Sequence, residues 1–253
     1  MTPLQRLARR LGYDLMPRKK ARPLQAQLIA VLDRFEISVI LDVGANRGQY
    51  GALLREWGYR GRIVSFEPQA LAHAALERRA AADPGWQVAP RMALGERDGE
   101  VEIEVSAESD MSSILPQSAF LREVSPSSAV THREPAPLHR LDTVAGPYVE
   151  QGDRVFLKID TQGYEPQVLA GAGALLERLC GIQLEMSLVP IYQGERDFRT
   201  TFDQLVAAGF APYLLLPGYF ERKLARQLQV DGVFMRAAPK EPCAPLRARP
   251  IRP

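Results

Sequence analysis

One acid near the end of the apolar run 39–43 and the turn that follows it have a regular spacing: Asp42, Gly44, Asn46 and Gly48. A glycine turn lets a ligand reach bare backbone, and the N–H groups of the following helix point at that ligand. An acid before the turn suits an amine-bearing ligand better than a phosphate. Asn46 stands where a dinucleotide fingerprint needs its second glycine, and asparagine tolerates positive φ. The spacing predicts either a cofactor turn or a glycine turn that only closes a βα unit.

A second acid, Glu67, ends the next apolar run, 62–66. An acid roughly 20 residues past the glycine turn commonly accepts hydrogen bonds from a ribose diol. Adenosine carries that diol in NAD and in S-adenosylmethionine (SAM) alike, so Glu67 indicates a nucleoside without choosing between them. The alternative is a helix cap, because Pro68 suits a first helical turn. We favour the ribose role because Asp42 lies at the matching distance.

Two further acids, Asp160 and Glu185, lie at or near the ends of the apolar runs 154–159 and 181–186. The carboxyl ends of parallel strands form the ligand edge of an open α/β sheet, so we expect all four acids to meet there. Lys158 precedes Asp160 by two residues, and a buried lysine needs a partner such as Asp42 or Asp160. His132 and His139 have pKa values suited to a base, although a lone loop histidine is often incidental.

Hydrophobic periodicity predicts the elements that carry these residues. Residues 106–140 have little periodicity and predict a long loop or lid, followed by a strand-like segment at 138–144, and 217–229 is predicted to be irregular or helical. Helices are predicted at 2–13, 24–35, 49–57, 70–82, 168–179 and 198–206, and strands at 39–43, 62–66, 86–91, 101–105, 154–159, 181–186, 211–216 and 230–235.

The 253 residues and their 46% apolar content fit one large domain. We expect a basic helical extension over 1–35, a domain over 36–236 and a disordered Pro-rich basic tail over 237–253. The net charge of +2 hides basic ends and an acidic body, which argues against a nucleic-acid partner. The basic ends are solvated tails or make weak contact with an anionic membrane surface.

Targeting and metal signals are weak. Two cysteines and three histidines give neither a disulfide-stapled scaffold nor zinc-site spacing. The apolar runs are too short to span a bilayer, and the N-terminal stretch does not have the apolar core of a secretory signal. We therefore expect a cytoplasmic protein.

As an ordered set, the motifs resemble those of the FkbM family of SAM-dependent methyltransferases over roughly residues 36–236. They are Asp-Val-Gly-Ala-Asn-x-Gly, Phe-Glu-Pro, Ala-Leu-Gly…Asp-Gly, Ser-Ser and Leu-Lys-Ile-Asp-x-x-Gly-Tyr-Glu…Val-Leu-x-Gly-Ala. The resemblance implies an α/β fold of the Rossmann-like class I methyltransferase type. Its seven-stranded, mostly parallel sheet has the order 3-2-1-4-5-7-6 with one antiparallel strand and helices on both faces.

The resemblance also implies the cofactor contacts. Asp42, Gly44, Asn46 and Gly48 would meet the methionine end of SAM, Glu67 the ribose, and Ala93 and Leu94 the adenine. Ala45, Pro68, Ser113 and Asp160 are further expected cofactor-binding residues. The family often has Glu where this chain has Gln162, and that difference removes one acid from any metal site.

The implied reaction is O-methylation of a hydroxyl on a small molecule or glycan. The acceptor oxygen must be held against the methyl group and lose its proton as it attacks. Asp160 is the first candidate for the base or orienting group, and Glu185 and His139 are the others. Mg²⁺ held by acids at this edge is a further option, for which the sequence has no full ligand set. The alternatives are an NAD-dependent oxidoreductase and a module that binds SAM without turnover.

Overall fold

The computed structural model describes residues 3–11 and 24–236. Residues 12–23 of the predicted basic extension and the whole predicted tail, 237–253, lie outside the described residues. The N-terminal helix α1 spans Pro3–Arg10, within the predicted 2–13. The division into 1–35, 36–236 and 237–253 stays a prediction.

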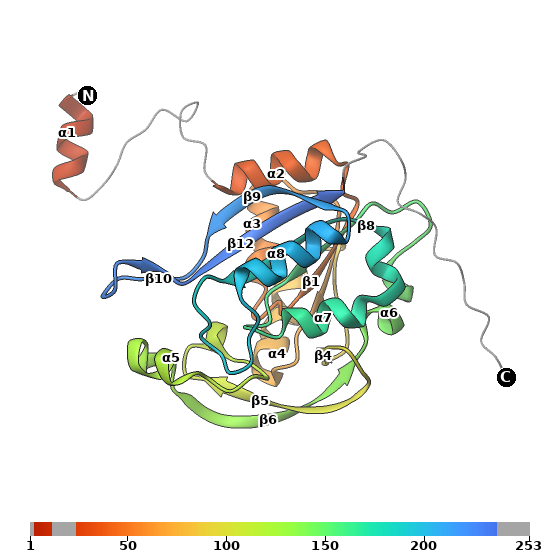
Figure 1. Cartoon of the computed structure of the whole chain (residues 1–253). Helices are drawn as coiled ribbons and strands as arrows, with labels where there is room; N and C mark the ends of the chain where they lie inside the picture. Colours follow the sequence, from red (N-terminus) through yellow and green to blue (C-terminus); the bar gives the residue numbers. More distant parts are fainter. Residues whose placement is uncertain (1–2, 12–23, 237–253) are drawn as a thin grey trace.

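A mixed seven-stranded sheet forms the centre of the fold (Figure 1), in the order β3-β2-β1-β7-β8-β12-β9. When the strands of this sheet alone are numbered along the chain, the order reads 3-2-1-4-5-7-6. β12 runs antiparallel to both neighbours, and the β1–β2, β1–β7, β2–β3 and β7–β8 pairs are parallel. The strands are β1 (Val39–Val43), β2 (Arg62–Phe66), β3 (Trp86–Val88), β7 (Val155–Ile159), β8 (Leu179–Ser187), β9 (Phe210–Pro217) and β12 (Gln229–Arg236).

Helices cover both faces of this sheet, which explains why its central strands read as continuous apolar runs. Ile40 and Phe156 pack toward α2 (Leu24–Arg34), α3 (Gln49–Glu56) and α4 (Ala70–Ala80). Leu41 and Leu157 pack toward α6 (Leu141–Val144), α7 (Glu165–Ala172) and α8 (Phe198–Ala207) on the opposite face. All five residues of β1 are buried, Asp42 included.

A second, three-stranded sheet lies at the carboxyl end of the first (Figure 1), and of its strands the sequence predicted only the one at 101–105. Its order is β4 (Ala93–Leu94), β6 (Val130–His139) and β5 (Gly99–Ser106). The predicted loop over 106–140 is therefore wrong in its second half, where β6 pairs antiparallel with β5. The predicted strand at 86–91 ends at Val88, and 138–144 divides into the end of β6 and helix α6.

The first half of the 106–140 segment is built from short turns. It contains the 3₁₀ turn Ser109–Met111, helix α5 (Ala119–Val124) and a second 3₁₀ turn, Pro126–Ser128. Leu121 of α5 packs with Ile191, Tyr192 and Leu228 in a small core of its own. This core joins the segment to the loop that follows β8.

Two other segments also differ from the prediction. The link at 217–229 contains a hairpin of β10 (Phe220–Glu221) and β11 (Arg226–Gln227) instead of a helix or irregular chain. The predicted helix over 168–179 ends at Ala172 and continues as a 3₁₀ helix, Gly173–Arg178. Gly173 has a φ of +46°, which interrupts the α-helix. A further 3₁₀ turn, Gly146–Tyr148, precedes β7.

None of the helices within 3–11 and 24–236 has the length and apolar content needed to cross a bilayer.

Candidate functional site

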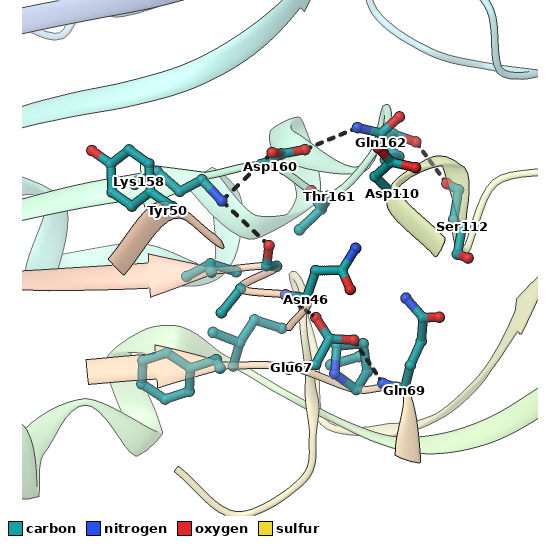
Figure 2. Close-up of a pocket in the computed structure, with 18 of the residues that line it drawn as sticks. Asn46, Tyr50, Glu67, Gln69, Asp110, Ser112, Lys158, Asp160, Thr161 and Gln162 are labelled. Atoms are coloured by element: carbon teal, nitrogen blue, oxygen red, sulfur yellow. Dashed lines mark hydrogen bonds and ion pairs between the residues drawn. The ribbon is translucent and has the colours of Figure 1, made fainter. Parts of the chain in front are cut away.

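A cavity of about 350 Å³ opens at the carboxyl ends of the central strands (Figure 2). Its floor is made by the turn after β1, the end of β2 and the end of β7. Ile103 of β5 and the segment around Ser109 to Ile114 close it from the second sheet. Of the residues selected from the sequence, Gly44, Ala45, Asn46, Glu67 and Asp160 thus line one space.

The turn after β1 leaves no room for a side chain at its first glycine. A Cβ on Gly44, whose φ is +72°, would lie 1.8 Å from the backbone oxygen of Asp160. Ala45 and Asn46 also line the cavity, and Asn46 has a φ of +47°, as its residue type allows. The turn therefore presses against the end of β7 while its backbone faces the cavity.

Gly48 differs from its predicted role, because it does not line the cavity. It begins α3 with a φ of +79°, and a Cβ there would lie 2.9 Å from Leu76 Cδ1 and 3.1 Å from Trp86. A glycine is needed at this position because of the positive φ at the start of α3 and the close packing against α4 and β3. The spacing in the sequence did not distinguish this requirement from contact with a ligand.

Glu67 lies on the cavity floor with 2% of its surface exposed. The backbone N–H of Asn46 donates to Oε2 at 2.7 Å, and that of Gln69 donates to Oε1 at 2.9 Å. Burial raises the pKa of Glu67 to about 7, and the two N–H donors hold it below what burial alone would give. Two donors leave lone pairs on both oxygens for a ligand.

Asp42 lies behind the residues that line the cavity. It is therefore not in position for the direct ligand contact that was predicted for it. It is fully buried and accepts a hydrogen bond from Ser65 Oγ at 3.1 Å. Lys158 Nζ stands 3.1 Å from Asp42 Oδ1, 3.5 Å from Asp160 Oδ2 and 3.3 Å from the Gly44 oxygen. Burial lowers the pKa of Lys158, but Asp42 and Asp160 outweigh it, so the net shift is upward.

The predicted ion pair is therefore present. Lys158 lines the cavity and carries a positive charge there, whereas its partner Asp42 does not line the cavity. The Nζ also stands 5.2 Å from the centre of the Tyr50 ring.

An apolar slot lies beyond Glu67. Pro68, Met92, Ala93, Leu94 and Ile103 line it, and cofactor contact by Pro68, Ala93 and Leu94 stays a prediction. Ser113 lines the same region, but its Oγ already donates to the Gln162 carbonyl oxygen at 2.6 Å and accepts from Leu115 N–H.

The opposite end of the cavity is polar and acidic. Asp160 lines it with 39% of its side chain exposed, and Gln162 Nε2 donates to its Oδ1 at 2.9 Å. The same Nε2 donates to Glu185 Oε2 at 3.0 Å (Figure 2 shows the Asp160 contact). Glu185 does not itself line the cavity, and burial followed by Asp160 raises its pKa. The sequence predicted that Glu185 contacts the acceptor directly. In the structure Glu185 lies behind the residues that line the cavity.

His139 lies away from this group and does not line the cavity. It pairs with Leu94 in the second sheet, and its Nδ1 stands 3.3 Å from Asp98. His132 is exposed on β6, beside Thr131. The structure thus brings neither histidine to the acids.

Several cavity residues were missed by the sequence reasoning. Asp231 of β12 and Gln183 of β8 line the acidic end, and the Tyr50 hydroxyl donates to Gln183 Oε1 at 2.8 Å. Burial raises the pKa of Asp231 to about 6. A charged residue inside the apolar run 230–235 was the available signal, of the same kind as Asp42 in 39–43.

The lid side of the cavity was missed too. Asn46 Nδ2 lies within hydrogen-bond distance of Ser109 Oγ, at 3.3 Å. Gln69 Nε2 donates to the main-chain carbonyl oxygen of Ser109 at 3.5 Å. The 3₁₀ turn Ser109–Met111 is therefore held over the glycine turn.

The residues within 3–11 and 24–236 contain no group of three or more His, Cys, Asp or Glu side chains that could hold a metal ion. The Mg²⁺ option finds no ligand set in this part of the chain.

Comparison with known proteins gives one family. The family model described as Methyltransferase FkbM domain matches residues 42–212. Among curated proteins, none matches the chain.

Several solved structures are similar to the fold. A methyltransferase FkbM from Methylobacillus flagellatus KT matches with a TM-score of 0.51 and 15% identity, over 79% of this chain and 44% of that one. The methyltransferase domain of bacterial CtHen1 matches with a TM-score of 0.47 and 10% identity, over 83% and 96% of the two chains. A 1,6-didemethyltoxoflavin-N1-methyltransferase from Burkholderia thailandensis, with bound S-adenosylhomocysteine, matches with a TM-score of 0.43 and 17% identity, over 85% and 77%.

At 15% identity, the first of these likenesses establishes the fold alone. The chain spans less than half the length of that relative.

Proposed function

The chain belongs to the FkbM family of SAM-dependent methyltransferases, and on that premise we propose that it methylates a hydroxyl oxygen of a carbohydrate or another polyhydroxylated natural product. The observation that carries the proposal is the position of Asp160. Its carboxylate is half exposed in the cavity, directly beside the glycine turn, and is flanked by Lys158 and Gln162.

The cavity fits the parts of SAM. Glu67 keeps free lone pairs on both oxygens at the centre of the floor, where two ribose hydroxyls can donate. The apolar slot of Met92, Ala93 and Leu94 suits a flat adenine ring. Among the described lining residues Lys158 is the one Lys or Arg, so it is the group that a ligand carboxylate would meet. The absence of a side chain at Gly44 lets the turn lie directly against the end of β7, beside Asp160.

SAM supplies an electrophilic methyl group on a sulfonium. The chain's own residues must then orient the acceptor and take its proton. We assign the acceptor hydroxyl to Asp160, which would accept the O–H proton as the new C–O bond forms and the S–C bond breaks. Lys158 Nζ stands 3.5 Å from Asp160 Oδ2 and offsets part of the negative charge at this end of the cavity.

Acid-lined walls favour hydroxylated acceptors. Asp160 and Asp231 offer carboxylate oxygens, and the amide of Gln183 faces the same space. Carboxylates accept hydrogen bonds from polyol hydroxyls and fix their orientation. The same carboxylates would also attract an amine, so nitrogen methylation is the second candidate and a matched acceptor pair is needed to separate the two.

The first experiment is calorimetric titration of the purified protein with SAM, S-adenosylhomocysteine (SAH) and NADH, with and without Mg²⁺. We expect micromolar binding of SAM and SAH alone. The protein is then incubated with SAM and paired acceptors, each sugar alongside its amino-sugar counterpart, and the methylated atom is located by mass spectrometry.

Methylation of the sugar oxygen supports the proposal, and methylation confined to the amine overturns it in favour of an N-methyltransferase. Tight SAM binding with no turnover on any acceptor supports a binding module instead. Binding of NADH alone would contradict the whole assignment.

A further inference from the structure

Gln162 occupies a backbone conformation that its residue type rarely adopts. Its φ is +55°, two residues after Asp160, and its side chain is 8% exposed against the cavity. The left-handed conformation costs about 1–2 kcal/mol in a residue of this kind. It turns the amide back toward the acids at the ends of β7 and β8.

The amide of Gln162 has a partner for each polar atom. Its Nε2 donates to Asp160 Oδ1 at 2.9 Å and to Glu185 Oε2 at 3.0 Å. Its Oε1 accepts from the Tyr192 hydroxyl at 2.9 Å, and its main-chain oxygen accepts from Ser113 Oγ at 2.6 Å. The two hydrogens of one NH₂ group therefore match the two carboxylates.

The hydrogen bonds fix which way the amide points. The nitrogen faces Asp160 and Glu185, which accept from it, and the oxygen faces Tyr192, which donates to it. Tyr192 has one hydroxyl hydrogen but two oxygen neighbours, Gln162 Oε1 and the Met111 carbonyl oxygen at 3.0 Å. The single hydrogen can be donated to either oxygen, and its donation to Gln162 Oε1 locks the amide.

We propose that Gln162 is a positioning residue, which uses its locked amide to hold Asp160 in one orientation at the methyl-acceptor end of the cavity and to bridge it to Glu185. The proposal rests on the function proposed above. Lys158 on one side and Gln162 on the other then fix both oxygens of Asp160. A glutamate at 162 would replace a neutral double donor by a third carboxylate.

The bridge reduces the repulsion between two acids in a crowded region. Burial, followed by Asp160, raises the pKa of Glu185, and donors that favour the ionised forms oppose that shift. The charged groups that face the pair come from several elements: Lys158 on β7, Glu165 on α7, Glu195 in the loop after β8 and Asp231 on β12, and Asp42 on β1 acts on Lys158.

The test that needs no acceptor is a carboxyl titration followed by NMR on the full-length protein. Carbon-13-labelled Asp and Glu carboxyls are assigned with D160N and E185Q. In Gln162→Met, which keeps the length but loses both donors, we expect the titrations of Asp160 and Glu185 both to move to higher pH. In Gln162→Glu, a third carboxyl should move them further.

Gln229→Met is the matched control. Gln229 is 1% exposed and its Nε2 donates to Glu185 Oε2 at 2.8 Å, without a hydrogen bond to Asp160. We expect this variant to move the titration of Glu185 alone. If Gln162→Met leaves the titration of Asp160 where it is in the wild type, the proposal is wrong whether or not the protein methylates anything.

The kinetic test uses the acceptor found in the paired screen. We expect Gln162→Met to lower kcat about 100-fold through misplacement of Asp160, to change the affinity for SAH little, and to move the acidic limb of the pH profile upward. A loss of SAH affinity as large as the loss of kcat would overturn the proposal.

Tyr192→Phe provides a second route if the Gln162 variants fold poorly. It removes the lock on the amide and keeps the ring in its buried site. We expect a smaller fall in kcat with the same shift of the pH profile. An unchanged kcat and an unchanged profile in Tyr192→Phe would contradict the locked amide.

Discussion

Glu67 is a buried acid poised between its two protonation states. Burial raises its pKa to about 7, while two backbone N–H groups favour its ionised form. A ribose diol would add two donors to the same carboxylate and lower that pKa on binding. If Glu67 holds the ribose as we propose, cofactor affinity is coupled to the release of a proton.

This coupling predicts the pH dependence of SAH binding. We expect SAH affinity to rise roughly tenfold between about pH 6 and about pH 8, as Glu67 becomes ionised before binding. Calorimetry in two buffers of different ionisation enthalpy would measure the proton released. Glu67→Gln should bind SAH about 10–100-fold more weakly and lose the pH dependence. Equal affinity across this range in the wild type would exclude Glu67 as the ribose partner.

Asp160 is expected to act on the acceptor and hardly at all on cofactor affinity. Asp160→Asn keeps the shape and loses the negative charge, so turnover should fall at least about 100-fold because no base takes the proton. The measurement is kcat together with the dissociation constant of SAH, which should stay within about threefold of wild type. Loss of SAH binding instead would move Asp160 to the cofactor site.

At the scale of elements, the contact between the β1 turn and the end of β7 holds the two halves of the cavity together. The Gly44 Cα lies so close to the Asp160 carbonyl that no side chain fits between them. The N–H of Asp160 also donates to the Val43 carbonyl oxygen at 3.0 Å. Backbone atoms that cannot move independently make this contact.

Gly44→Ala should therefore destabilise the fold by more than about 3 kcal/mol, because backbone must shift in addition to the unfavourable φ. Gly194→Ala is the matched control, since Gly194 has nearly the same φ, +77°, with nothing within 4 Å of the added Cβ. The control should cost only about 1–2 kcal/mol. Denaturant unfolding of both variants checks this, and equal losses would show that the close contact is relieved at no cost.

Hydrophobic periodicity predicted the elements that are buried on both faces. It failed for segments that have one face exposed to solvent. Strands such as 39–43 end in acids that the sheet geometry brings together, so the floor of the cavity could be inferred. β6 could not, because Pro135 and Pro137 argue against a central strand. β4 pairs with β6 only at Leu138 and His139, so the prolines lie where β6 has a partner on one side.

The types of residue at the site were easier to predict than how each one is placed relative to the cavity. Asp42 and Glu67 both end buried strands, yet Asp42 faces a lysine and Glu67 faces the cavity. Gly48 fits the glycine spacing but is required by packing on Trp86. These distinctions depend on which neighbour arrives from far along the chain, and spacing does not contain that information.

At the scale of the whole molecule, buried acids with raised pKa values lower the free energy of unfolding at neutral and alkaline pH. Burial raises the pKa of Glu67 to about 7, of Glu165 to about 8 and of Asp231 to about 6. In the unfolded chain these acids ionise near pH 4 to 4.5, so between there and about pH 8 the folded state holds more protons. The free energy of unfolding must then fall as pH rises through this window.

We expect this fall to be on the order of 3 kcal/mol from Glu67 alone in the ligand-free protein. Lys158, with its raised pKa, loses its proton above this window. Urea unfolding at about pH 5.5, 7 and 8.5 measures the slope. Glu165→Gln should flatten part of it, and a free energy of unfolding that increases with pH would contradict the burial of these acids.

The position of β12 has a consequence for how the protein is made. This strand is the last of the main sheet to leave the ribosome, yet it inserts between β8 and β9 and delivers Asp231 to the cavity wall. A nascent chain that has emerged only through β9 holds the glycine turn, Glu67 and Asp160 but not the far wall. Translation must therefore pass residue 236 before the acceptor end can close, so an abortive chain would be inactive even though it contains every motif of the cofactor floor.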